Sequence, residues 1–250
     1  MDVVTTGGRT ARICAAVGVV LMAAGIFHLG VFLVDGGPWE GPVSWRKPAT
    51  FGLSFGLTLL TVVWLASLLP LGSTARAWLL GLFAADSVVE VGGITLQAWR
   101  GVPSHVNMEG GANTTVSMVL AAGGGLLIVL LGWMAVAAFR GSPAAAPSMR
   151  LALRYGFASL MIGLLSGAAM IARGVPEARG GEQQRAYHDV GFLKAVHGVS
   201  LHGVLVLPAL AWVLSRLDLP EERRTAWVRA GVAVYAVAIA GALVVSLAGV

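Results

Sequence analysis

The sequence is poor in charged residues, cysteine and lysine, and these shortages exclude several classes of protein. Charged residues make up 12% of the chain, about half of what a soluble domain carries. The single cysteine, Cys14, excludes an intramolecular disulfide and a cysteine-rich metal site. The only lysines are Lys47 and Lys194, and the arginines stand at the ends of apolar segments rather than in a basic run. The sequence therefore predicts no nucleic-acid partner.

Hydrophobic residues are abundant instead, and they form long stretches. They make up 57% of the 250 residues. Seven stretches are long enough to cross about 30 Å of hydrocarbon at about 1.5 Å per residue. We therefore predict an all-α, polytopic integral membrane protein in which residues 1–250 form a single transmembrane domain. The predicted helices of this bundle lie near 11–34, 48–69, 76–98, 114–139, 150–172, 195–215 and 225–248.

The distribution of basic residues predicts the orientation. If the amino terminus is cytoplasmic, ten Arg and Lys residues lie on the inner side and seven on the outer side. This bias favours a cytoplasmic amino terminus and an extracytoplasmic carboxyl terminus, because cytoplasmic loops carry the excess of positive charge. The heavy use of Ala, Gly, Val and Arg is typical of a GC-rich bacterial genome. The predicted location is thus the plasma membrane of a bacterium.

With this orientation, the ionisable residues of the predicted helices gather toward the outer side. The two carboxylates within the spans, Asp86 and Glu90, are four residues apart and share one face of the third helix. His28, Glu90 and His202 lie about 9–12 Å below the outer ends of three different helices. A charge at such depth costs about 2.5–3.5 kcal/mol, so we expect these side chains to point inward and pair. All five histidines fall in the outer half or the outer loops, namely His28, His105, His188, His197 and His202.

The first hypothesis for this cluster is a metal ion or haem b site that opens to the outside. Imidazole is the commonest metal-ligand side chain, and a carboxylate can complete a set of two histidines and one carboxylate. His28, His202 and Glu90 would be the ligands, with His197 as an alternative. For haem, two histidines from different helices would bind the iron. Outer-loop residues would provide further ligand or propionate contacts: Arg46, Lys47, Arg100, His105 and His188.

A second hypothesis is a proton-coupled transporter or small-solute binding protein. Buried Asp, Glu and His side chains form proton relays in membranes, and Asp86, Glu90 and His28 would form the relay here. The expected partners are the lipid bilayer, a small molecule that enters from the outer face, and further copies of the chain.

A third hypothesis is an intramembrane hydrolase of a lipid-like substrate that uses a metal-activated water. Seven helices with histidines and acidic residues resemble the ceramidase-like membrane hydrolases in outline. The His-x-x-x-His motif of that family is missing from this chain, so no residue role is carried over. The sequence also allows an accessory subunit without chemistry, and it leaves open whether any reaction is catalysed.

One short motif occurs twice. Arg100-Gly101-Val102-Pro103 recurs as Arg173-Gly174-Val175-Pro176. We expect both copies to end a helix that runs outward, with Gly just past the helix end and Pro to stop it. The recurrence alone does not decide whether the chain contains an internal duplication.

Overall fold

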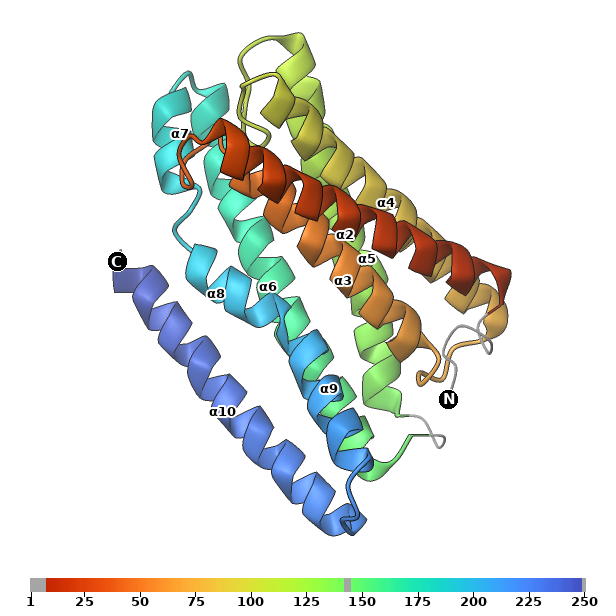
Figure 1. The fold of residues 1–250 in the computed structure, drawn as a ribbon. Helices are drawn as coiled ribbons and strands as arrows, with labels where there is room; N and C mark the ends of the chain where they lie inside the picture. Colours follow the sequence, from red (N-terminus) through yellow and green to blue (C-terminus); the bar gives the residue numbers. More distant parts are fainter. Residues whose placement is uncertain (1–7, 142–144, 249–250) are drawn as a thin grey trace. The chain divides into compact units, whose positions relative to one another are not determined.

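The computed structural model describes residues 8–141 and 145–248, and the regular elements in these ranges are all α-helices (Figure 1). Seven helices in this part of the chain are long and apolar enough to cross a membrane, with α8 and α9 counted as one span, Lys194–Ser215. The prediction of seven apolar helices is therefore confirmed. The elements are α2 (Arg9–Asp35), α3 (Arg46–Ala66), α4 (Ser73–Trp99), α5 (Gly111–Arg140), α6 (Pro147–Arg179), α7 (Gln183–Asp189), α8 (Lys194–Leu201), α9 (Gly203–Ser215) and α10 (Glu221–Ala248).

The two copies of the repeated motif have different structures. The first copy follows the end of α4, where Gly101 has a φ of 65°. The amide groups of Gly101 and Val102 donate to the carbonyls of Ala98 and Gln97, which is the capping pattern of a glycine just past a helix end. The second copy lies inside α6, with Pro176 in the helix. The prediction that this copy ends a helix is wrong, because the equivalent glycine cap forms later, at Gly181 with a φ of 87°.

The chain divides into two compact units according to its internal contacts. Unit 1 comprises Met1–Trp64, Ser73–Leu126 and Ile171–Asp189, and unit 2 comprises Leu65–Gly72, Leu127–Met170 and Val190–Val250. Both α5 and α6 contribute residues to each unit. The single transmembrane domain stays a prediction.

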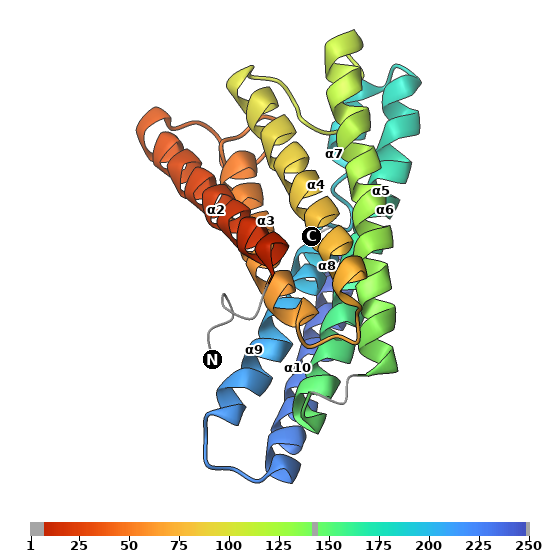
Figure 2. The same cartoon turned by 90° about the vertical axis from the view of Figure 1, so that its right-hand side faces the viewer.

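Within unit 1, α2 and α3 lie side by side (Figures 1 and 2) and approach each other at glycines. A Cβ atom added to Gly52 would lie 2.8 Å from Gly25 Cα, and one added to Gly56 would lie 2.5 Å from the Gly18 carbonyl oxygen. Residues without a side chain allow helix backbones to come this close. Helix α2 also packs against α4, where the Cys14 thiol donates to the Leu80 carbonyl at 3.4 Å.

Within unit 2, α10 packs along α8 and α9. The Tyr235 hydroxyl of α10 donates to the Val199 carbonyl of α8 at 2.6 Å. Gly231 of α10 leaves room for Leu210 of α9, because an added Cβ would lie 2.6 Å from Leu210 Cδ2. A small apolar core joins these helices to the start of α6, and its buried members are Ala152, Leu207, Ala211, Leu214 and Val228.

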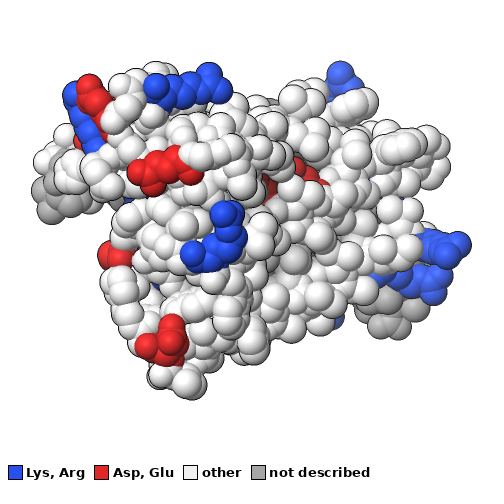
Figure 3. All heavy atoms as spheres, turned by 90° about the horizontal axis from the view of Figure 1, so that it is seen from above, with Lys and Arg blue, Asp and Glu red and all other residues white. Residues whose placement is uncertain are grey.

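Charged side chains are sparse on the surface. Figure 3 shows one face, on which Lys, Arg, Asp and Glu form a few separate groups among mostly uncharged atoms. Many exposed residues of the long helices are large and apolar, among them Val34, Trp78, Val129 and Leu247. An apolar surface of this kind on helices of this length is expected of a protein that sits in lipid rather than water.

Candidate functional site

The two carboxylates of α4 are buried and face a glycine of α5. Asp86 is 6% exposed and Glu90 is 4% exposed. A Cβ atom added to Gly123 would lie 2.5 Å from Glu90 Oε1 and 2.8 Å from Asp86 Oδ1. Both carboxylates therefore occupy the space that a side chain at position 123 would need. The four-residue spacing placed them on one face of α4, as the sequence predicts.

One oxygen of this acid pair, defined as Asp86 and Glu90, has no hydrogen-bond partner. It is Oδ2 of Asp86, which is buried. Buried polar atoms are nearly always hydrogen-bonded, and leaving one without a partner costs about 1–3 kcal/mol. The neighbouring Ser87 is different, because its hydroxyl donates to the Phe83 carbonyl at 2.7 Å. A buried carboxylate oxygen without a partner makes Asp86 a candidate for a functional role.

Gln97 lies two turns beyond Glu90 on α4 and is fully buried. Its Nε2 donates to Asn113 Oδ1 of α5 at 3.3 Å and lies 3.5 Å from the Pro103 carbonyl. Its Oε1 accepts a hydrogen bond of 2.6 Å from Arg100, which is exposed. A chain of polar groups therefore connects the surface to the buried end of α4.

The loop between α4 and α5 is held by further amide and hydroxyl groups. Asn107, fully buried, donates from its side chain to the Pro103 carbonyl at 3.2 Å. The Asn107 amide donates to Ser117 Oγ of α5 at 3.0 Å, and Ser117 Oγ donates in turn to the Ser104 carbonyl at 3.2 Å. The loop is consequently a fixed structure at the end of α4.

Gln183 of α7 fixes the same loop at a strained residue. Val106 has a φ of 59°, a conformation that is unfavourable for a β-branched side chain. Gln183 Nε2 donates to the Val106 carbonyl at 2.6 Å, and Gln183 Oε1 accepts from the Met108 amide at 3.0 Å. In α7 itself, burial and the nearby Glu109 carboxylate raise the pKa of Tyr187 to about 12, so this phenol stays neutral.

His28 is buried, but its partners are not the acid pair. Its Nδ1 lies 2.7 Å from the Ala24 carbonyl, and its Nε2 accepts a hydrogen bond of 3.1 Å from Trp99 Nε1. Since the indole can only donate, Nδ1 carries the proton. The ring also stacks on Trp45 at 6.2 Å between centroids. Trp99 is nine residues beyond Glu90 on α4, about 180° around the helix, so the α4 side chain that binds His28 points away from Glu90.

The other two predicted histidine ligands belong to unit 2. His197 Nδ1 lies 2.7 Å from the Gly163 carbonyl of α6. His202 lies between α8 and α9 and is exposed, and its Nδ1 lies 2.6 Å from the Gly198 carbonyl. Each of these imidazoles is therefore bonded to a backbone carbonyl.

Arg100 is bonded to a residue nearby in the sequence, and the predicted outer-loop residues Arg46, Lys47 and His105 have nearby partners too. Arg46 forms an ion pair with Glu40 at 3.3 Å and donates to the Trp39 carbonyl, and Lys47 donates to the Pro42 carbonyl at 2.7 Å. These two residues brace the turn before α3. His105 lies 2.9 Å from the Ser104 hydroxyl and packs near the Phe51 ring. His188 is exposed in the last turn of α7.

These contacts do not form a ligand set for a metal or haem. Among residues 8–141 and 145–248, no three side chains of His, Cys, Asp and Glu are grouped so that they could hold a metal ion. Both ring nitrogens of His28 have protein partners, so a bond to iron or zinc would break one of them. The metal and haem hypotheses stay predictions, and the surroundings of His28 do not fit them.

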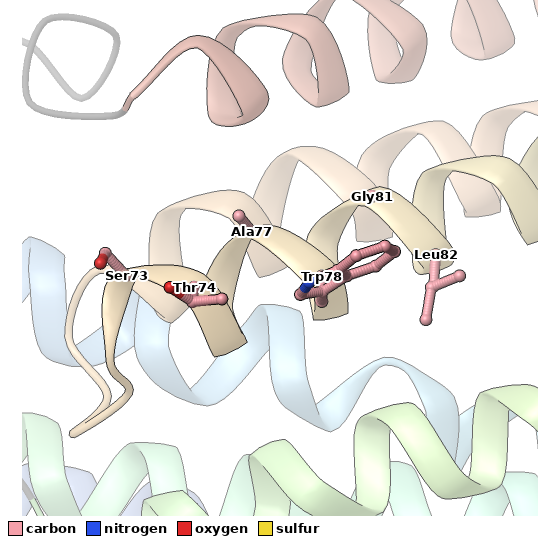
Figure 4. A pocket seen from close by; sticks show the side chains of 6 residues that line it. All are labelled: Ser73, Thr74, Ala77, Trp78, Gly81 and Leu82. Atoms are coloured by element: carbon pink, nitrogen blue, oxygen red, sulfur yellow. The ribbon is translucent and has the colours of Figure 1, made fainter.

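A pocket at the start of α4 is formed by residues other than the predicted site residues. It is lined by Ser73, Thr74, Ala77, Trp78, Gly81 and Leu82 (Figure 4), and no predicted site residue contributes to it. Its lining is mostly apolar and offers few groups that would orient a ligand.

Sequence reasoning missed the glycine that faces the acid pair and the amides at the end of α4 and around the loop that follows it. Gln97, Asn107, Asn113 and Gln183 are neutral and stand at helix ends or in loops, where polar residues are ordinary. The available signal was the spacing of Asp86, Glu90 and Gln97, which puts all three within about 40° of one another on a helix.

Comparison with known proteins assigns no family to the chain. No protein-family model matches the sequence, and no curated protein or solved structure matches it either.

Proposed function

We propose that the protein is a multi-pass protein of a bacterial plasma membrane that binds and releases a proton at Asp86 and Glu90. Proton binding would accompany the transport or binding of a small solute that enters from the outer face. In this proposal the amino terminus is cytoplasmic, the carboxyl terminus is outside, and several copies assemble. The observation that carries the proposal is the buried acid pair on Gly123, with Asp86 Oδ2 unpartnered.

The spacing of the two carboxylates supports proton binding. Cβ atoms four residues apart on a helix are about 5–6 Å apart. Two negative charges at that separation repel each other by about 3 kcal/mol at an effective dielectric constant of about 20. The span around them is apolar, so a proton shared by the pair removes both the repulsion and part of the burial cost. Such carboxyl groups are the usual relays of proton-moving membrane proteins.

The other hypotheses have less support. A metal site and a metal-dependent hydrolase need a gathered set of ligands, and the described residues hold none. A haem iron would have to displace one of the protein partners of His28. Proton exchange needs only the two carboxyl groups and a route to them. We therefore prefer the proton-coupled hypothesis.

The proposal is tested in liposomes that contain the purified full-length protein and a lumenal pH-sensitive dye. A valinomycin-induced potassium potential, negative inside, drives protons inward, with and without amino acids, sugars and small amines outside. We expect protein-dependent acidification that falls about tenfold in Glu90→Gln, because the relay loses its carboxyl group. The control Glu222→Gln, exposed in the first turn of α10, should match the wild type. No protein-dependent flux under either condition, or full flux in Glu90→Gln, would contradict the proposal.

A further inference from the structure

We propose that protons reach the acid pair along the contact between α4 and α5, and that Leu120 closes this route. The mouth of the route is formed by Gln97, Asn113 and Arg100. This inference rests on the proposed function, since it concerns access to the proton-binding residues.

The facing residues of α4 and α5 follow one antiparallel register. Asp86 and Glu90 face Gly123, Gly93 faces Leu120, and Gln97 is bonded to Asn113. Residue numbers rise along α4 as they fall along α5. The polar residues of α4 therefore form one buried stripe against α5, at most 6% exposed at any of its three positions, which are Asp86, Glu90 and Gln97.

The mouth of this stripe is continuous with the protein surface. Arg100 is exposed and donates to Gln97 Oε1 at 2.6 Å. Gln97 Nε2 donates to Asn113 Oδ1 at 3.3 Å, and the Asn113 amide donates to the Glu109 carbonyl at 2.9 Å. The exposed Arg100 guanidinium and the half-buried Asn113 amide can exchange hydrogen bonds with water, so water and protons have a polar path that ends at the buried Gln97 side chain.

The stripe is interrupted between Gln97 and Glu90. These residues are seven positions apart, which is about 10 Å along the helix, and on this face of α4 only Gly93 and Ile94 lie between them. A Cβ atom added to Gly93 would lie 2.9 Å from Leu120 Cδ2. The Leu120 side chain thus lies over Gly93, and both Leu120 (3% exposed) and Ile94 (fully buried) exclude water.

This interruption acts as a hydrophobic plug. Apolar constrictions stop ions and protons because water leaves them. Leu120 can pack over α4 at this point because Gly93 has no side chain. A change in the Leu120 rotamer or a small separation of α4 from α5 would connect Gln97 with the acid pair. Access to the acid pair is therefore controlled by apolar side chains, of which Leu120 is the one that α5 contributes.

The test measures access directly, as the modification of Asp86 and Glu90 by a water-soluble carbodiimide with an amine. The reagent is added outside sealed proteoliposomes of the full chain, and peptide mass spectrometry gives the modified fraction over time. We expect slow modification in the wild type and about tenfold faster modification in Leu120→Ala, because the plug is gone. Leu120→Met, which keeps the volume, and Val119→Ala, an exposed residue on the same turn, should match the wild type.

Three further measurements make each outcome decisive. Leu120→Val, a milder truncation, should give an intermediate rate even if Leu120→Ala folds poorly. Gln97→Leu in the Leu120→Ala background should return the rate to that of the wild type by closing the mouth. Equal rates in wild type, Leu120→Val and Leu120→Ala would overturn the plug. Membrane-permeant dicyclohexylcarbodiimide needs no aqueous route, so its failure to modify either carboxyl would instead contradict the proposed function.

Discussion

Replacing Asp86 with Leu is expected to make the protein more stable and to abolish proton transfer. Leucine branches at Cγ as aspartate does, and it places methyl groups where the carboxylate oxygens lie against Gly123. The variant removes a buried oxygen that has no partner, so we expect a gain of about 1–3 kcal/mol in the free energy of unfolding. Thermal unfolding in detergent, followed by tryptophan fluorescence, measures the first effect, and the liposome assay measures the second.

The neighbouring Ser87 provides the control for this prediction. Ser87 is buried, as Asp86 is, but its hydroxyl is bonded to the Phe83 carbonyl. Ser87→Ala removes a satisfied group, so it should be neutral or destabilising by up to about 1 kcal/mol, with normal proton flux. A loss of stability in Asp86→Leu would show that the carboxyl group is structural, and it would count against a functional role.

A side chain at Gly123 is expected to displace both carboxylates. In Gly123→Leu, the first side-chain atom already falls 2.5 Å from Glu90 Oε1 and 2.8 Å from Asp86 Oδ1. The acid pair must move and α4 must shift from α5, so we expect a loss of about 1–3 kcal/mol in stability together with loss of proton flux. The same unfolding and flux measurements report both losses.

The glycine next in the chain is a closely matched control. An added Cβ at Gly124 meets nothing within 4 Å, so Gly124→Leu should keep the stability and the flux of the wild type. If both variants behave alike, the carboxylates do not depend on Gly123, and the geometry of the acid pair described above is wrong.

The helices could be predicted from the sequence because long apolar stretches have few other solutions. The hydropathy of each segment also set its approximate limits, as for α4 and α10. The predicted end of a helix was wrong where the cap bonds form at another glycine. Gly174 and Pro176 resemble a helix stop, yet α6 continues to Arg179 and its glycine cap is Gly181. The motif alone does not determine which glycine adopts a positive φ, since Gly101 does and Gly174 does not.

The site could be predicted only within single helices. The four-residue spacing of Asp86 and Glu90 predicts that they share one face of α4, and in the structure both face Gly123. The equal depth of His28 and Glu90 predicts a joint site, but depth says nothing about direction around a helix. The partner of His28 is Trp99, about 180° from Glu90 on α4. The contact between Gly123 and the acid pair could not be predicted either, since a sequence does not show which sides of two helices meet.

The most direct test of the account is an infrared spectrum of the purified protein at neutral pH. A protonated carboxylic acid has a carbonyl stretch that is distinct from the bands of a carboxylate and of the amide backbone. We predict such a band in the wild type, loss of the band in the double variant Asp86→Asn and Glu90→Gln, and an unchanged band in Glu222→Gln. A wild-type spectrum without the band, or a band that persists in the double variant, would contradict the claim that the acid pair holds a proton.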